Sequence, residues 1–358
     1  MAYTTIDNGE EHFNTILYTG DGSADNDITG VGFAPDWVWA KNRGAADAHW
    51  VLDSTRGATK GLYTNGTAAE NTQNHLISFD SDGFSVGNQA NGLNTSSNNY
   101  VSWNWKCNGG TTTSQTGSDI NSVTQVNTDA KFSIVTYNGA SGSDSADNGG
   151  AYWRVKHGLG SVPKFAIFKS TTHVHGWYVW HHGFSGASKS DGDHIVLNTV
   201  AAMASEGSQI LWGNTEWSTT EFEIGGWDVV NRSGKSYIAY MFDEVKGYSK
   251  FGSYTGNGNA DGPFVYTGFK PAWLMIKRSD ADGENWQMFD NKRDGFNNGS
   301  SSNKMLKANV SETEDTNSTG FLDLLSNGFK IRESAARHNA SGGYYIYMAF
   351  AEHPFVSS

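Results

Sequence analysis

The sequence predicts an all-β protein built of three tandem antiparallel β-sandwich units, of the jelly-roll or concanavalin-like kind. Three observations predict this class: aromatic residues make up 13% of the 358-residue chain, 43 residues are glycine, and one set of motifs recurs three times. Aromatic residues favour strands, and runs of Ala, Leu, Glu and Lys that would favour helices are scarce. Recurring motifs indicate that one structural unit is repeated along the chain.

Composition and charge exclude several classes of protein. Acidic residues outnumber basic ones by 37 to 25, a net charge of -12 that repels phosphate and anionic lipid, so no nucleic-acid partner is expected. The chain has no apolar run long enough for membrane insertion, and residues 1–13 lack the features of a signal peptide. The single cysteine, Cys107, excludes an internal disulfide and a cysteine-based zinc site. We expect a soluble protein made in the cytoplasm of its host cell.

Each repeat opens with a short segment that ends in a tyrosine, at Tyr18, Tyr137 and Tyr254. A proline and a lysine six residues apart then follow, in segments 35–41, 163–169 and 271–277. Proline is tolerated at the start of a strand, and the four residues before each lysine are all apolar. Such a strand must be covered on both faces, by its own unit's core and by a loop, a neighbouring unit or another chain.

The later motifs of each repeat behave as further strands. A tryptophan follows the lysine at Trp50, Trp177 and Trp286. Segments 100–105, 237–242 and 345–350 close the repeats and alternate with period two, so one face of each should line a core.

These motifs divide the chain into five parts. Residues 1–12 form an N-terminal leader that would anchor the protein, and the three units span residues 13–107, 131–249 and 250–358. Residues 108–130 are rich in Gly, Ser and Thr, a composition typical of a flexible linker, and we expect a partner chain to order them. The units would then form a compact three-bead protein.

Two groups of residues suggest metal binding. Five histidines lie close together in the second repeat: His173, His175, His181, His182 and His194. Zinc or nickel would need three or four of them to converge, and exposed loop histidines are the favoured interpretation.

Acidic loops suggest calcium at Asp21, Asp25 and Asp27, or at Asp144 and Asp147, but none completes a calcium-binding loop. We therefore predict no metal and no cofactor, with calcium as the alternative.

The sequence also predicts a protein that is not an enzyme. Glu221 and Glu223 share one face of a strand-like segment, but no partner carboxylate across a cleft can be named for glycoside hydrolysis. Nothing resembles a nucleophile with its base and orienting group. Asp53 with Arg56 and Asp290 with Arg293 are expected to hold turns by ion pairs worth under about 1 kcal/mol.

Aromatic residues outside the repeated positions could stack on sugars. The candidate glycan-stacking residues are Trp177, Tyr178, Trp180, Trp212 and Trp217. Repeated aromatic residues belong more often to a core than to a site, so Trp177 is the weakest of the five.

The first repeat resembles a module that recurs in structural proteins of marine tailed bacteriophages, which are often labelled tail fibres or virion proteins. The matching segments are YTGDG from Tyr18, ITGVGFAPDWVWAKNR from Ile28, DSTRGATKGL from Asp53, SFDSDGFSVG from Ser78 and YVSWNWK from Tyr100. The resemblance is close over the first repeat, recognisable in the third and thin in the second. No site residues are carried over from it.

The resemblance implies a tail-fibre-like or capsid-decorating protein on the virion surface, with a role in particle assembly and host attachment. Its expected partners are other virion structural proteins, copies of itself as a homotrimer, and a host surface glycan. One alternative is a carbohydrate-binding protein for receptor recognition, and a second is a polysaccharide depolymerase.

Overall fold

The computed structural model describes residues 4–141, 151–189, 191–206, 211–213, 215–293, 304–316 and 320–351. Strands dominate these residues, and all their sheets are antiparallel, which confirms the predicted all-β class. The helices among them are η1 (Gly9–Glu11) and α1 (Ala336–Asn339), and neither is long and apolar enough to cross a membrane.

The first repeat forms a six-stranded sheet, in the order β1-β9-β3-β4-β5-β6, and a three-stranded sheet, β2-β8-β7. Its strands are β1 (Phe13–Thr19), β2 (Asn26–Thr29), β3 (Trp37–Asn42), β4 (Trp50–Asp53), β5 (Lys60–Tyr63), β6 (Asn71–Thr72), β7 (Leu76–Asp80), β8 (Gly83–Val86) and β9 (Asn99–Trp105). Val38 and Leu52 of the large sheet share a buried core with Ile28 and Phe84 of the small one, so the two sheets form a sandwich.

The second repeat forms a seven-stranded sheet, β10-β11-β12-β18-β14-β15-β16, and a two-stranded one, β13-β17. Its strands are β10 (Thr113–Gln115), β11 (Ser122–Asn127), β12 (Phe132–Asn138), β13 (Trp153–Lys156), β14 (Phe165–Ser170), β15 (Tyr178–His181), β16 (Ile195–Val196), β17 (Glu221–Ile224) and β18 (Ser236–Phe242).

The third repeat forms a six-stranded sheet, β19-β27-β21-β22-β23-β24, and a three-stranded one, β20-β26-β25. Its strands are β19 (Ser249–Thr255), β20 (Phe264–Tyr266), β21 (Pro271–Arg278), β22 (Gln287–Asp290), β23 (Lys304–Lys307), β24 (Asp315–Thr316), β25 (Leu322–Leu325), β26 (Gly328–Ile331) and β27 (Tyr344–Ala351).

One strand order recurs in the three large sheets. In each, the opening strand pairs with the closing strand, the closing strand pairs with the strand that follows the proline, and that strand pairs with the next in sequence. The register also recurs, because Trp37 of β3, Phe165 of β14 and Trp273 of β21 each face the last aromatic residue of the closing strand. Across these strands, the three repeats therefore share one topology and one register.

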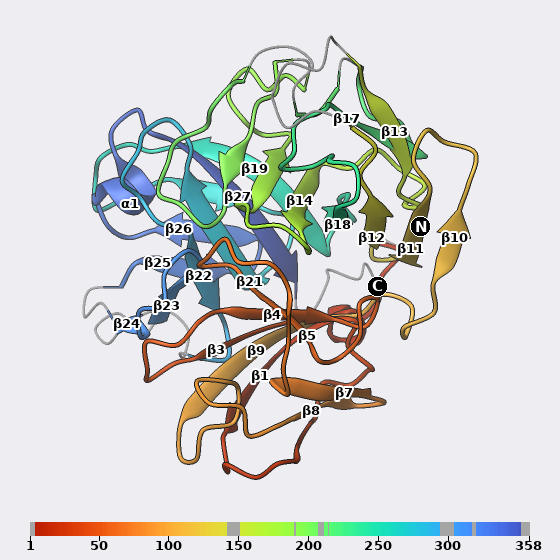
Figure 1. Ribbon diagram of the computed structural model, residues 1–358. Helices are drawn as coiled ribbons and strands as arrows, with labels where there is room; N and C mark the ends of the chain where they lie inside the picture. Colours follow the sequence, from red (N-terminus) through yellow and green to blue (C-terminus); the bar gives the residue numbers. More distant parts are fainter. Residues whose placement is uncertain are drawn as a thin grey trace.

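The outer faces of the large sheets meet in one shared aromatic core. Its contacts include Trp37 stacked on Tyr240, Phe13 on Phe350 and Phe165 on Phe251, with ring centroids 4.7, 5.4 and 5.5 Å apart. Each contact joins a different pair of repeats, and the three lobes surround a common centre (Figure 1). The strand after the proline is therefore covered on both faces, as predicted, and the three repeats meet in one shared core.

Equivalent backbone hydrogen bonds also link the three repeats in a ring. Glu70 N donates to Thr171 O at 2.8 Å, Met203 N to Ser279 O at 2.8 Å, and Glu314 N to Arg43 O at 2.9 Å. The acceptors follow β14, β21 and β3 at matching positions, so each repeat accepts one such bond and donates another.

The tract at residues 108–130 is not a flexible linker. It contains β10 and β11, and β11 pairs with β12 along its whole length. Asp36 fixes its start by accepting hydrogen bonds from the backbone N–H groups of Cys107, Gly109 and Gly110. The chain's own sheet thus orders this tract, where a partner chain had been expected.

The described part of the leader packs onto the rest of the protein. Ile6 is buried in the shared core, and Lys292 of the third repeat lies 3.4 Å from Glu10. Residues 4–12 therefore pack as part of the fold, and their role as an anchor stays a prediction.

The tryptophan predicted to recur in all three repeats occupies equivalent positions in only two of them. Trp50 of the first repeat lies one residue away from the equivalent position. The register pairs Trp50 with Ala40, Tyr178 with Phe168 and Gln287 with Ile276, so His49, not Trp50, is equivalent to Trp177 and Trp286. Because successive side chains of a strand point to opposite faces, Trp50 lies in the first sandwich core while Trp177 and Trp286 lie in the shared core.

Candidate functional site

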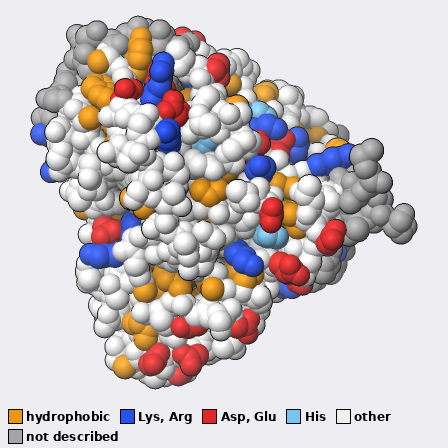
Figure 2. Space-filling view, turned by 90° about the vertical axis from the view of Figure 1, so that its right-hand side faces the viewer, with side chains coloured by type: hydrophobic (Ala, Val, Ile, Leu, Met, Phe, Trp, Pro, Cys, Tyr) orange, Lys and Arg blue, Asp and Glu red, His pale blue; other side chains and the backbone are white. Residues whose placement is uncertain are grey.

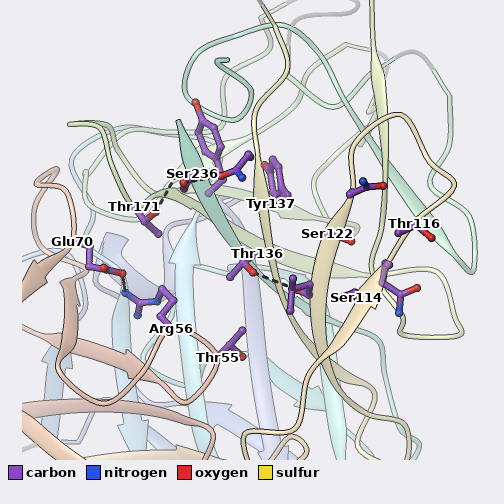
Figure 3. A pocket seen from close by; sticks show the side chains of 15 residues that line it. Thr55, Arg56, Glu70, Ser114, Thr116, Ser122, Thr136, Tyr137, Thr171 and Ser236 are labelled. Atoms are coloured by element: carbon purple, nitrogen blue, oxygen red, sulfur yellow. Dashed lines mark hydrogen bonds and ion pairs between the residues drawn. The ribbon is translucent and has the colours of Figure 1, made fainter. Parts of the chain in front are cut away.

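A polar groove of about 620 Å³ lies between the first and second repeats. The loop after β4 supplies Thr55 and Arg56 on one side, and β10, β11 and β12 supply the other side (Figure 3). Thr171 and Ser236 lie at its upper end in that view. The tract once expected to be a linker therefore forms much of the groove.

Buried charges hold the Arg56 side of the groove in place. Arg56 Nε lies 2.6 Å from Asp53 Oδ2, and its Nη1 lies 3.0 Å from Glu70 Oε2. Tyr240 of the second repeat donates a 2.7 Å hydrogen bond to Asp53 Oδ2. These carboxylates raise the pKa of Arg56 against the opposing effect of burial, which is the largest single influence and lowers it. Arg56 is therefore a fixed cation at the wall.

Uncharged polar groups make up most of the remaining lining. Hydroxyl groups come from Thr55, Ser114, Thr116, Ser122, Thr136, Thr171 and Ser236, and amides from Gln115, Asn121 and Asn138. Tyr137 and Tyr237 add stacked rings whose centroids are 5.4 Å apart. Such a lining can exchange hydrogen bonds with a neutral ligand that carries many hydroxyl groups.

The predicted glycan-stacking tryptophans lie elsewhere and are not available to a ligand. Trp177, Trp180, Trp212 and Trp217 are at most 3% exposed, and Tyr178 is partly buried against the shared core. Trp177 Nε1 donates to Tyr63 O at 3.0 Å, across the boundary between two repeats. A ring must present an open face to stack on a sugar, so this prediction is wrong for the four tryptophans.

The five histidines of the second repeat do not form one cluster. His181 Nε2 donates to Tyr347 O at 3.0 Å and His182 Nε2 to Phe251 O at 2.6 Å, both in the third repeat. His194 Nδ1 donates to Gly192 O at 2.9 Å. His173 and His175 instead lie beside Asp228, which the sequence had not singled out. In the described part of the chain this is the one group of three or more potential ligands from His, Cys, Asp or Glu.

The described acidic candidates accept hydrogen bonds from serine residues. Asp21 accepts from Ser23 N at 2.8 Å, and Asp27 accepts from Ser85 Oγ at 2.6 Å. Asp25 accepts a hydrogen bond through its backbone oxygen, and Asp144 and Asp147 lie outside the described residues.

Glu221 and Glu223 lie on β17 as expected. Glu221 accepts from Ser118 Oγ, and Glu223 accepts from Thr215 N at 2.8 Å.

The two predicted ion pairs form, but in a different environment from the one expected. Arg293 Nε lies 2.5 Å from Asp290 Oδ2 with both side chains fully buried, and the Asp53–Arg56 pair is nearly as buried. Trp103 of the first repeat donates a 2.9 Å hydrogen bond to the same Asp290 oxygen. The stabilisation of under about 1 kcal/mol expected for an exposed ion pair therefore does not apply to these two buried pairs.

Charge is distributed unevenly on the face seen in Figure 2. Uncharged polar and backbone atoms cover most of it, and carboxylates gather at its lower end, level with β7 and β8 of Figure 1. No extended basic patch lies on this face, in keeping with the net charge of -12.

Together, the sheets and the groove define an all-β protein of sandwich architecture with a polar groove between its first two repeats. Residues 8–354 match the model of a family described as a domain of unknown function (DUF7483), and the chain belongs to this family. The match spans all three large sheets. No curated protein matches the chain significantly, and neither does any solved structure.

Proposed function

We propose that this protein is a non-enzymatic structural component of a bacteriophage particle surface, where it binds other particle proteins and takes part in assembly and host attachment. The observation that carries the proposal is the closed ring of three repeats around one aromatic core. In the described residues the three repeats pack directly on one another, so such a body can transmit force between neighbouring subunits with little change of shape. The resemblance of the first repeat to modules of tailed-phage structural proteins supports the viral setting.

Purified particles of a phage that encodes this protein test the proposal. We expect mass spectrometry of gradient-purified particles to detect it in copy numbers similar to those of other structural proteins, and cryo-microscopy to place its three lobes at the particle surface. A replication enzyme of the same phage is the matched control and should be lost on purification. Detection in infected cells but not in particles would overturn the proposal.

A second function, recognition of a host carbohydrate, is favoured by the groove. Its hydroxyl and amide lining matches the hydrogen-bonding groups of a neutral sugar chain. This candidate differs from the predicted one, because the ligand would be held by hydrogen bonds in the groove and not by the buried tryptophans.

A glycan array tests the second function. Asn121→Ala and Gln115→Ala remove groove amides and should abolish binding to any glycan that the parent protein retains. Asn74→Ala, an exposed asparagine that does not line the groove, should leave binding unchanged. Equal binding by all these variants would exclude the groove as the sugar site.

A further inference from the structure

Two histidines and one aspartate converge just beyond the end of β14. His173, His175 and Asp228 each offer one ligand atom, and these atoms all lie within 4.8 Å of one another. The two imidazole rings have centroids 4.8 Å apart, and His175 Nε2 lies 3.1 Å from Asp228 Oδ2. All three residues are half-buried, so solvent ions can reach them.

Hydrogen bonds fix the backbone on both sides of this group. His173 N donates to Ser170 Oγ at 3.1 Å, and Ser236 N donates to Thr172 Oγ1 at 2.9 Å. On the opposite side, Tyr237 donates from its hydroxyl to Asp228 O at 2.5 Å. The ligands are thus presented by a backbone that is already in place, which lowers the cost of ordering them around an ion.

The imidazole of His175 and the carboxylate of Asp228 already face each other. His175 Nε2 lies 3.1 Å from Asp228 Oδ2, so a nitrogen and an oxygen ligand point toward the same place. A cation bound there would be shared by two ligand types that divalent transition metals accept.

We infer that His173, His175 and Asp228 form a binding site for a divalent transition-metal ion, with zinc as the best match. Two imidazoles and one carboxylate are ligands that zinc accepts, whereas calcium and magnesium require oxygen ligands throughout. The fourth position is left for water or a group from a partner.

The three ligand atoms need to move only slightly closer together to bind the ion. Ligand atoms around a tetrahedral zinc ion lie about 3.4 Å apart, given bonds of about 2.0–2.1 Å. Rotation of the half-buried His173 side chain can supply the required movement of up to about 1.4 Å.

Metal titration of the untagged, full-length protein after chelator treatment tests the site. We expect calorimetry to give one high-affinity zinc ion per chain, and Co²⁺ to show the visible absorption of a tetrahedral site. His173→Ala, His175→Ala and Asp228→Asn should each weaken zinc binding by at least about tenfold. His182→Gln, which changes a histidine of the same repeat outside the group, should leave it unchanged.

Two results would overturn the inference: no zinc binding by the folded parent protein, or equal binding by the parent and all three ligand variants. Circular dichroism of each variant must match the parent, so that lost binding is not confused with unfolding. If His173→Ala alone unfolds, the decision rests on Asp228→Asn, which keeps side-chain size. The site does not depend on the proposed function, since the titration uses the isolated protein.

Discussion

Three lysines at equivalent positions are buried, and within the described ranges no carboxylate contacts them directly. Lys41, Lys169 and Lys277 are fully buried, and each ammonium donates to backbone carbonyl oxygens near the boundary between repeats. Lys169 Nζ, for example, lies 2.9 Å from Ser170 O and 3.2 Å from Thr67 O of the first repeat. Burial lowers the pKa of Lys41 to about 8, of Lys169 to about 7 and of Lys277 to about 8.

We predict that stability rises with pH from about pH 7 to pH 9. The ordinary lysine pKa of 10.5 applies to the unfolded chain, so in this window the unfolded state binds more protons than the folded state. Nearer pH 10 the buried tyrosines, whose pKa values are raised in the folded state, reverse the sign. Raising the pH in this window therefore raises the free energy of unfolding, and chemical denaturation at several pH values measures it. Lys169→Met should flatten the rise, whereas Lys250→Met, at a partly exposed lysine, should not. A parent protein with equal stability at both ends of the window would contradict this.

The buried pair of Asp290 and Arg293 yields a second prediction at the level of residues. Asp290→Ala removes the partner of Arg293 and the acceptor of Trp103, and should lower the free energy of unfolding by about 3–5 kcal/mol. Denaturant titration measures the loss. Glu312→Ala breaks a pair whose carboxylate is largely exposed and should cost under about 1 kcal/mol. Similar losses in the two variants would mean that burial does not determine the strength of these pairs.

Among the elements, β10 and β11 distinguish the second sheet from the other two. They add to the edge that β12 would otherwise expose, whereas β1 and β19 lie at the edges of their sheets. Two buried side chains attach this segment to the first repeat: Asp36 binds its backbone, and Gln125 donates to Ser54 and Thr55. A segment with the composition of a linker can thus form a strand when buried partners make hydrogen bonds with its backbone N–H and C=O groups.

We predict that Asp36→Ala loosens this segment. The substitution leaves the backbone N–H groups of Cys107, Gly109 and Gly110 without their shared acceptor. Hydrogen exchange should therefore accelerate from residue 107 through β10, while β19 and β27 of the third repeat change little. Asp25→Ala, at an exposed aspartate of the same repeat, is the control. Unchanged exchange in the Asp36 variant would show that β-sheet pairing alone holds the tract.

At the scale of the whole molecule, the repeats depend on one another because they share a core. The third repeat contributes Phe251, Trp273, Trp286 and Phe350 to it, and these large side chains would meet water if the repeat stood alone. This arrangement differs from beads on a chain, in which each unit buries its own apolar surface.

We therefore predict that residues 250–358 alone do not form a cooperative native structure. The isolated fragment should bind the dye ANS and melt without a sharp transition, whereas the full chain should unfold in one cooperative step. Calorimetry and circular dichroism of the two proteins make the comparison. A fragment with a sharp transition and no dye binding would support three independent domains instead.

The linear order of residues was enough to predict the all-β class and the positions of the strands that recur. Apolar alternation, the spacing from proline to lysine and the turn-forming loops are local properties, and strand formation responds to them directly. The same local information wrongly predicted that Trp50 is equivalent to Trp177 and Trp286. Neither the spacing of tryptophans nor the composition specifies which face of a strand meets which core.

Everything that depends on distant segments required the folded chain. Trp180 and Trp217 were candidates for sugar stacking until packing buried them, and residues 108–130 were expected to need a partner chain until Asp36 and β12 were seen to order them. Asp228 lies 53 residues beyond His175, so no local pattern could connect them. Burial and convergence arise from contacts between parts of the chain that folding brings together, and such contacts leave little trace in the spacing of neighbouring residues.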